Sequence, residues 1–99
     1  MLRIDKKTDG KNVVIALSGR LDTTAAPELD AELKDVFDSA ENLTFDFSGI
    51  DYISSAGLRV LLSAQKIMNK QGSMRLTNVS DSVKDIFEVT GFSEILTIN

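Results

Sequence analysis

The chain has 99 residues, and we expect residues 1–99 to form a single domain. Hydrophobic residues make up 42% and charged residues 26%, proportions that are typical of a globular protein and exclude a disordered one. The absence of cysteine and histidine from the sequence excludes disulfides, thiolate or imidazole metal sites, cysteine nucleophiles and Ser-His-Asp triads.

The charge balance argues against two classes of partner. The chain carries 11 basic and 15 acidic residues, for a net charge of −4. Contacts between basic residues and phosphates dominate the affinity for nucleic acids and anionic membranes, so we expect neither as a partner. No apolar run approaches the roughly 20 residues that span a bilayer. Residues 1–11 lack the apolar segment of a signal peptide, and we expect a cytoplasmic protein.

The N-terminal segment predicts a hairpin. Leu2 and Ile4 alternate with charged residues, which indicates a short edge strand. Asp9 and Gly10 are typical of a type I′ turn, in which both central residues need positive φ. The apolar run 13–17 then predicts a strand that is covered on both faces.

A helix is expected next. Thr23 or Thr24 can act as its N-cap, and Pro27 suits the first turn, where an N–H is not needed. Apolar residues then recur at helical spacing and predict one buried stripe, made of Ala26, Leu29, Leu33, Val36, Phe37 and Ala40. The acidic residues between them are expected to face solvent.

The middle of the chain predicts a strand followed by a second helix. The strand comprises the alternating residues 43–47 and ends at Ser48 and Gly49. The helix starts near Ser54 or Ser55, and Gly72 can end it. Its inner face is expected to carry Leu58, Leu61, Leu62 and Met68, widened by Val60 and Ile67.

The last third predicts a strand, a helix and a final strand. The strand covers residues 74–77, and the last strand covers 95–98. Ser80 caps the helix between them, and Gly91 ends it, with Val83, Ile86 and Phe87 inward. The order β-β-α-β-α-β-α-β predicts an α/β fold. We expect a mixed, largely parallel sheet of four to five strands, with an antiparallel edge hairpin and three or more packed helices.

Two predicted loops could form a site at the carboxyl ends of the parallel strands, where such sheets bind ligands. They span residues 18–24 and 46–57. If the topology is right, one end of the sheet gathers Asp22, Asp46, Asp51, Ser54 and Ser55.

The two serines allow a functional and a structural interpretation. A hydroxyl at a helix N-terminus faces unpaired N–H groups, and this place stabilises an added phosphate. Alternatively, Ser54 and Ser55 only cap the helix, which the spacing alone favours. Asp22 can likewise cap the first helix, Asp46 can belong to the polar face of a strand end, and Gly57 can relieve crowding between helix and sheet.

We expect no enzyme and no cofactor. The chain has neither a G-x-x-x-x-G-K-[ST] loop nor a G-x-G-x-x-G loop. A serine nucleophile needs a base, and Lys66 lies about three helical turns beyond Ser55. The loop acids Asp22, Asp46 and Asp51 are a weak signal for a metal site, and we expect none.

Three segments resemble one family, the STAS domains. Residues 13–22, VVIALSGRLD, resemble its V-x-L-x-G-x-L-D opening. Residues 46–58, DFSGIDYISSAGL, resemble its central motif D-x-S-x-[VI]-x-[FY]-[IM]-[DS]-S-[SAT]-G-L. Residues 83–92, VKDIFEVTGF, resemble its third helix, V-x-x-x-[LF]-x-x-[ST]-G-[LF]. The three segments occur in the family's order and together cover nearly the whole chain.

At this length the chain resembles the anti-sigma factor antagonists of that family. In these proteins an anti-sigma factor that is also a serine kinase phosphorylates a serine near the N-terminus of the second helix, and a serine phosphatase resets the switch. The resemblance implies Ser55 as the acceptor. Many members have aspartate at the position before this serine, whereas this chain has Ser54. The second hydroxyl makes Ser54 a competing acceptor. The implied partner surface comprises Asp22, Thr23, Asp46, Ser54, Ser55, Ala56, Gly57 and Leu58. We expect a monomer or a weak dimer.

Three other functions fit the same residues. The chain could be a STAS subunit of a lipid-transport ATPase or of a sensory complex, without a phosphorylation switch. It could be a nucleotide-binding domain that uses the same loops. It could also be a structural interaction module in which Ser54 and Ser55 are helix caps only.

Overall fold

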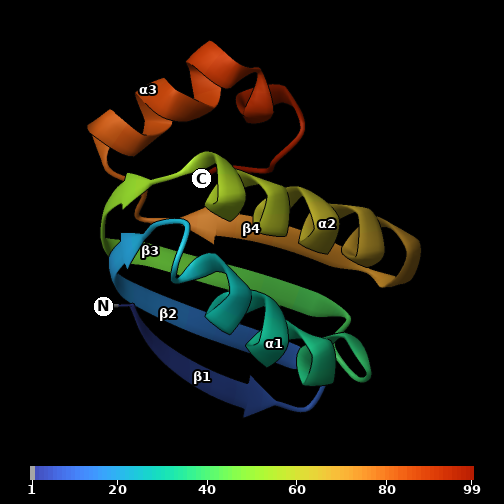
Figure 1. Cartoon of the computed structure of the whole chain (residues 1–99). Helices are drawn as coiled ribbons and strands as arrows, with labels where there is room; N and C mark the ends of the chain where they lie inside the picture. Colours follow the sequence, from blue (N-terminus) through green and yellow to red (C-terminus); the bar gives the residue numbers. More distant parts are fainter. Residues whose placement is uncertain (1) are drawn as a thin grey trace.

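The sheet has four strands in sequential order, as the computed structural model of residues 2–99 shows (Figure 1). β1 and β2 pair antiparallel, whereas β2, β3 and β4 are parallel. This confirms the predicted mixed α/β sheet. In chain order the elements are β1 (Arg3–Asp9), β2 (Asn12–Leu21), α1 (Ala26–Phe37), β3 (Asn42–Ile53), α2 (Ser55–Gln71), β4 (Ser73–Thr77), α3 (Asp81–Thr90) and the short 3-10 helix η1 (Phe92–Glu94).

Within residues 2–99, helices cover only one face of the sheet, so the prediction that both faces of residues 13–17 are covered is wrong. In β2, Val13, Ile15 and Leu17 are buried, whereas Val14 between them is 41% exposed. Each parallel crossover moves one strand further in the same direction. Because such crossovers are right-handed, α1 and α2 lie on the same face (Figure 1). The other face stays open to solvent.

The N-terminal hairpin is confirmed, but its turn is not the predicted type. Asp9 pairs with Asn12, so the turn consists of Gly10 and Lys11. Gly10 has a φ of 61°, and Asn78 is the non-glycine residue with positive φ among residues 2–99. Only the first central residue therefore has positive φ, whereas a type I′ turn needs two.

The start of α1 differs from the prediction in its cap. Ala25 occupies the N-cap position, and neither Thr23 nor Thr24 does. The Asp22 Oδ1 accepts a hydrogen bond from the backbone N–H of Ala25 at 2.9 Å and so orders the turn before the helix, but α1 has no side-chain cap hydrogen bond. Pro27 lies in the first turn as predicted.

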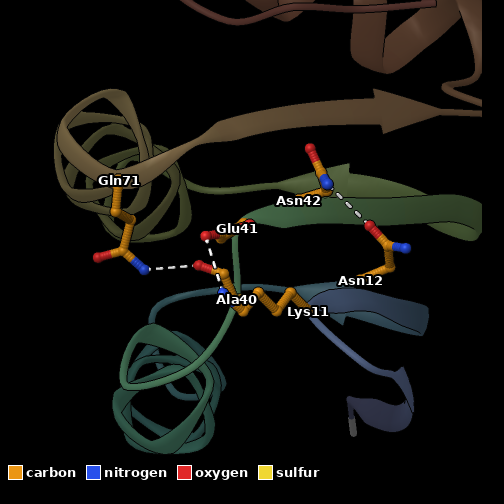
Figure 2. Close-up of polar contacts among 6 residues, drawn as sticks. All are labelled: Lys11, Asn12, Ala40, Glu41, Asn42 and Gln71. Carbon is orange, nitrogen blue, oxygen red and sulfur yellow. Dashed lines mark hydrogen bonds and ion pairs between the residues drawn. The ribbon is translucent and has the colours of Figure 1, made fainter.

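Helix α1 ends at Phe37, earlier than the apolar stripe predicts. A side chain from α2 donates hydrogen bonds to backbone carbonyls at this end of α1 and just beyond it. The Gln71 Nε2 donates to the carbonyl oxygens of Phe37 at 2.8 Å and Ala40 at 2.7 Å. Ala40 is buried but outside the helix. Figure 2 shows Gln71 pointing at Ala40, with the exposed ion pair Lys11–Glu41 beside it. The C-terminal ends of both helices are thus tied together.

Strand β3 is longer than predicted. It continues through Ser48 and Gly49, where we expected it to end, as far as Ile53. Gly49 pairs with Ser18 where the register of the two strands shifts. A Cβ at Gly49 would come within 2.8 Å of the Ser18 Cα, so this glycine allows a close approach of the backbones instead of ending the strand. Most of the predicted loop 46–57 is therefore strand.

The inner face of α2 is largely as predicted. Leu58, Leu61 and Met68 are buried, Leu62 is half-buried, and Ile67 is 37% exposed. Buried Ala64 and Gln65 were not predicted. No helix among residues 2–99 has the length and apolarity needed to span a membrane.

Helix α3 begins and ends where predicted. Ser80 Oγ accepts from the backbone N–H of Val83 at 3.4 Å, and Gly91 has a left-handed φ of 81°. The buried ring of Phe87 packs at 6.4 Å from that of Phe47 in β3 and fixes the helix to the sheet.

The predicted last strand is reduced to one parallel bridge, between Leu76 and Ile98. Ile95 still has helical dihedral angles at the end of η1, so too few residues remain to form a strand.

Candidate functional site

The N-terminus of α2 is built around Ser54. Its Oγ accepts a hydrogen bond from the N–H of Gly57 at 3.3 Å, which confirms the cap interpretation for this serine. Its own N–H donates to the carbonyl oxygen of Leu21 at 2.9 Å. Ser54 is only 9% exposed. Its hydroxyl is thus buried and engaged in holding the helix end.

Ser55 differs from its neighbour in access. It is the first residue of α2 and is exposed to solvent. Its side chain lies at the positive end of the helix dipole, beside the N–H groups of the first turn. A negative group added to Ser55 would therefore be stabilised where it is attached.

Gly57 sets the distance between α2 and the end of β2. A Cβ at this position would lie 2.8 Å from Leu21 Cγ and 2.9 Å from both Ile53 Cγ1 and the Leu21 carbonyl oxygen. The prediction that Gly57 relieves crowding between helix and sheet is confirmed. Only a glycine lets the first turn of α2 rest directly on the two strand ends.

Two strand ends bring part of the predicted site together. Asp22 directly follows β2, and the hydrogen bond from Ser54 N–H to Leu21 joins that strand end to the start of α2. Asp22 is half-buried, and Thr23 beside it is exposed. Asp22, Thr23 and the two serines therefore share one end of the sheet, as predicted.

Asp46 does not share that end. It lies in the middle of β3, between Ala16 of β2 and Thr77 of β4. Ile53 lies seven positions further along the strand, roughly 20 Å away along the chain. The sequence placed it at the same end because we expected β3 to stop at Gly49. Asp51, exposed on β3, lies two residues before that strand's end.

The carboxylate of Asp46 instead makes hydrogen bonds where the register of β2 and β3 shifts. Its Oδ1 accepts from the N–H of Ser48 at 3.0 Å and from Asn78 Nδ2 at 3.1 Å. These hydrogen bonds, that of Ser48 first, hold the pKa of Asp46 below its usual value. Among residues 2–99 no three acidic side chains gather closely enough to hold a metal ion.

A groove between α1 and α2 opens next to the exposed serine. It has a volume of about 440 Å³ and an apolar floor with one acidic and one basic residue. Its lining residues are Thr23, Ala26, Pro27, Asp30, Ala56, Arg59, Val60 and Ser63. Sequence reasoning missed Asp30 and Arg59. The helical spacing of 56, 59, 60 and 63 was the available signal for the α2 side.

Replacing each serine by alanine should separate their roles. Ser54→Ala removes the cap of α2 and should lower the free energy of unfolding by about 1 kcal/mol. Ser55→Ala removes an exposed hydroxyl and should change it by less than about 0.5 kcal/mol. Urea denaturation of both variants measures the difference. Equal losses would contradict the assignment of the cap to Ser54.

Asp46 should make stability depend on acid pH. Its lowered pKa means that the folded state favours the carboxylate, so the stabilisation is present above the unfolded pKa of about 4 and disappears as the pH falls through the lower folded pKa. The difference in unfolding free energy between wild type and Asp46→Asn should therefore become smaller as the pH is lowered from about 6 to about 3. Denaturation at a series of pH values measures it, and a constant difference would contradict the prediction.

Comparison with known proteins identifies the fold. The family model described as STAS domain matches residues 3–99. A Bordetella bronchiseptica protein named as a candidate anti-sigma factor antagonist, BtrV, is 37% identical over 94 residues, which cover 93% of this chain and 80% of the relative. The anti-sigma-B factor antagonist of Bacillus subtilis is 27% identical over 99 residues, which cover 99% of this chain and 91% of that relative.

Solved structures agree with the sequence comparison. The anti-sigma factor antagonist SpoIIAA in its unphosphorylated form superimposes with a TM-score of 0.84 at 20% identity, covering 98% of this chain and 88% of that one. The phosphorylated form of SpoIIAA, from Bacillus, gives a TM-score of 0.77 at 19% identity and covers 98% of this chain and 91% of that one. Since the family model spans residues 3–99, the chain belongs to the STAS domain family, and the superpositions show the same fold.

Proposed function

We propose that this protein is an anti-sigma factor antagonist that binds an anti-sigma factor serine kinase and releases it when Ser55 is phosphorylated. The names of the two relatives in Bordetella and Bacillus support the first part. The observation that carries the second part is the contrast between two adjacent serines. Ser55 is exposed, whereas the hydroxyl of Ser54 is buried and bonded to the N–H of Gly57.

Access decides between the two serines as phosphate acceptors. In the transfer, the serine oxygen attacks the γ-phosphorus of the kinase's ATP, the bond to the β-phosphate oxygen breaks, and ADP leaves. The hydroxyl proton passes to a base of the kinase. Ser55 can present its oxygen in this way without unfolding. Ser54 would first have to give up its cap and expose a buried side chain.

The phosphate would weaken binding by its charge. It adds about −1.5 to −2 charges at neutral pH. Asp22 is half-buried at the same end of the sheet, Asp30 lines the neighbouring groove, and the chain already carries a net charge of −4. A dianion inside the contact then costs desolvation and is repelled by these acidic side chains of the same surface. The N-terminus of α2 stabilises the phosphate locally, so we expect the fold to stay unchanged.

The proposed partner surface differs in part from the residues that the family resemblance implies. The solvent-accessible part of this surface comprises the exposed residues Thr23 and Ser55 and the half-buried residues Asp22 and Ala56. The buried residues Ser54, Gly57 and Leu58 would shape this surface from below. Asp46 lies too far along β3 to join a contact centred on Ser55. A serine phosphatase would restore the free hydroxyl, and we place the cycle in the cytoplasm with a monomer or weak dimer.

Binding to the kinase tests the proposal. The wild type, Ser55→Ala, and protein carrying phosphoserine at position 55 are titrated into the purified anti-sigma factor kinase of the same organism. Phosphoserine should weaken binding at least about tenfold, or 1.4 kcal/mol, and Ser55→Ala should bind like the wild type. Ser93→Ala, at an exposed serine outside this surface, is the control for serine removal and should bind like the wild type. Equal affinities of the phosphorylated and unmodified proteins would refute the switch.

The other functions named from the sequence predict different outcomes. A transporter ATPase that co-purifies in place of a small kinase would indicate an accessory subunit of a transporter. Nucleotide turnover by the isolated chain, abolished by Asp22→Asn, would indicate a nucleotide-hydrolysing domain. Either result would overturn the proposed function.

A further inference from the structure

Arg59 lies one helical turn after Ser55 on the exposed surface of α2. Both residues are exposed, and they are separated by four positions. Side chains at i and i+4 of a helix lie on the same face, with Cβ atoms about 5–6 Å apart. Long helical side chains lean toward the N-terminus, so the stem of Arg59 runs over the turn that contains Ser55.

The guanidinium of Arg59 is not committed to another partner. The ion pairs found among residues 2–99 join Arg3 to Asp5, Lys6 to Glu32 and Lys11 to Glu41. Arg59 takes part in none of them. It lines the α1–α2 groove together with Asp30, and among residues 2–99 no ion pair joins the two. Its charge is thus free to turn to a stronger anion.

We propose that Arg59 binds the phosphate of phosphorylated Ser55 and so withdraws its positive charge from the α1–α2 groove. This inference rests on the proposed function, because it assigns a receptor to the phosphate that the kinase would add. Three features support it. The i, i+4 spacing fits, the acidic group precedes the basic one as helix pairs prefer, and a planar guanidinium can bond two phosphate oxygens at once.

The pairing changes the groove as well as the modified serine. Before phosphorylation, the groove carries the carboxylate of Asp30 on α1 and the guanidinium of Arg59 on α2. When Arg59 turns to the phosphate, Asp30 is left as the remaining charged residue of the groove lining. A partner that fits the groove when both Asp30 and Arg59 line it then meets negative charge at the phosphate on Ser55 and at Asp30. Arg59 thus acts as a positioning residue that carries the effect of the phosphate from Ser55 into the groove.

Phosphorus NMR tests the pairing directly. Phosphoserine is installed at position 55 during translation, and the chemical shift of its phosphorus is followed from about pH 4 to pH 8, around the second ionisation near pH 6. Pairing with Arg59 favours the dianion. The midpoint of the titration should therefore rise by about 0.3 pH unit in Arg59→Gln, as expected for an exposed helix pair.

Two controls make the result specific. Arg75→Gln removes an arginine from β4, whose Nε donates to Thr44 at 3.3 Å, and should leave the midpoint unchanged. Arg59→Lys keeps the charge but loses the planar fork, so its midpoint should lie between those of the wild type and Arg59→Gln. Arg59→Ala is a second charge-removing variant should the glutamine protein fold poorly. Equal midpoints in the wild type and the charge-removing variants would overturn the inference.

The test separates this inference from the proposed function. Because the phosphate is installed during translation, the titration needs no kinase and gives its answer even if the cell never phosphorylates Ser55. If phosphoserine weakens kinase binding while the titration shows no effect of Arg59, then only the role of Arg59 fails. If Arg59 shifts the midpoint but phosphoserine leaves kinase binding unchanged, then the switch fails and the pairing stands.

Discussion

Gly72→Ala should lower the free energy of unfolding by about 4 kcal/mol, a large part of the stability of a small domain. Gly72 caps the C-terminus of α2, and a Cβ there would overlap the carbonyl oxygen of Glu41. That oxygen also accepts the hydrogen bond from Ser73 N–H at 2.8 Å, which begins the pairing of β4 with β3. Since the obstacle is backbone, it can retreat only by breaking this pairing.

Chemical denaturation of the wild type, Gly72→Ala and Gly10→Ala measures the effect. Gly10 is the matched glycine: it has a φ of 61°, but a Cβ there would meet nothing within 4 Å. Its alanine variant should therefore lose only the strain of a left-handed backbone, about 1 kcal/mol. If the two variants unfold at the same denaturant concentration, the close contact between Gly72 and Glu41 is not what holds these elements together.

Gly57→Ala should cost about 2 kcal/mol and also disturb the candidate site. The new methyl group would press on Leu21 and Ile53 at 2.8–2.9 Å, and one of the three nearest atoms is the Leu21 carbonyl oxygen. The same oxygen accepts the hydrogen bond from Ser54 N–H. To relieve the contact, the first turn of α2 must move away from β2, carrying Ser55 with it.

Two measurements check this prediction. Denaturation gives the loss of stability, with Ser63→Ala, at an exposed position of the same helix, as a control that should change it by less than about 0.5 kcal/mol. Amide chemical shifts of residues 54–58 report the movement of the helix start. A Gly57→Ala protein with wild-type stability and unchanged shifts would show that the space at Gly57 is not needed.

Local signals in the sequence located several helix ends well. The caps Ser80 and Gly91, and a start of α2 near Ser54 or Ser55, are confirmed because a cap depends on a few neighbouring residues. The cap of α1 was missed because Thr23 and Thr24 have the right chemistry, but the chain turns once more before the helix begins. Asp22, one residue earlier, reaches the free N–H of Ala25 instead.

Features that depend on distant pairing could not be derived from the pattern. The apolar run 13–17 looked doubly covered, because its composition does not tell on which side the helices pack. That follows from the strand order, which only the assembled sheet defines. The extension of β3 through Gly49 likewise depends on pairing with Ser18 of β2. Because β3 continues past Gly49, Asp46 lies inside the strand and not at the predicted site.

The groove beside Ser55 shows the same limit. The residues of one helix can be grouped by spacing, and this brings Arg59 next to Ser55 in principle. Asp30 comes from α1, so its place opposite Arg59 depends on how the two helices pack. The sequence could therefore indicate the proposed acceptor serine through its family motif, but not the charged groove beside it.

Site-resolved mass spectrometry of the protein purified from its native cells tests the central claim most directly. The intact mass shows whether a phosphate is present, and fragmentation assigns it to a residue. We expect one phosphate on Ser55 that appears and disappears with growth conditions and is absent from Ser55→Ala. A phosphate on Ser54 would contradict the assignment of the acceptor. A chain without phosphate under every growth condition would contradict the switch itself.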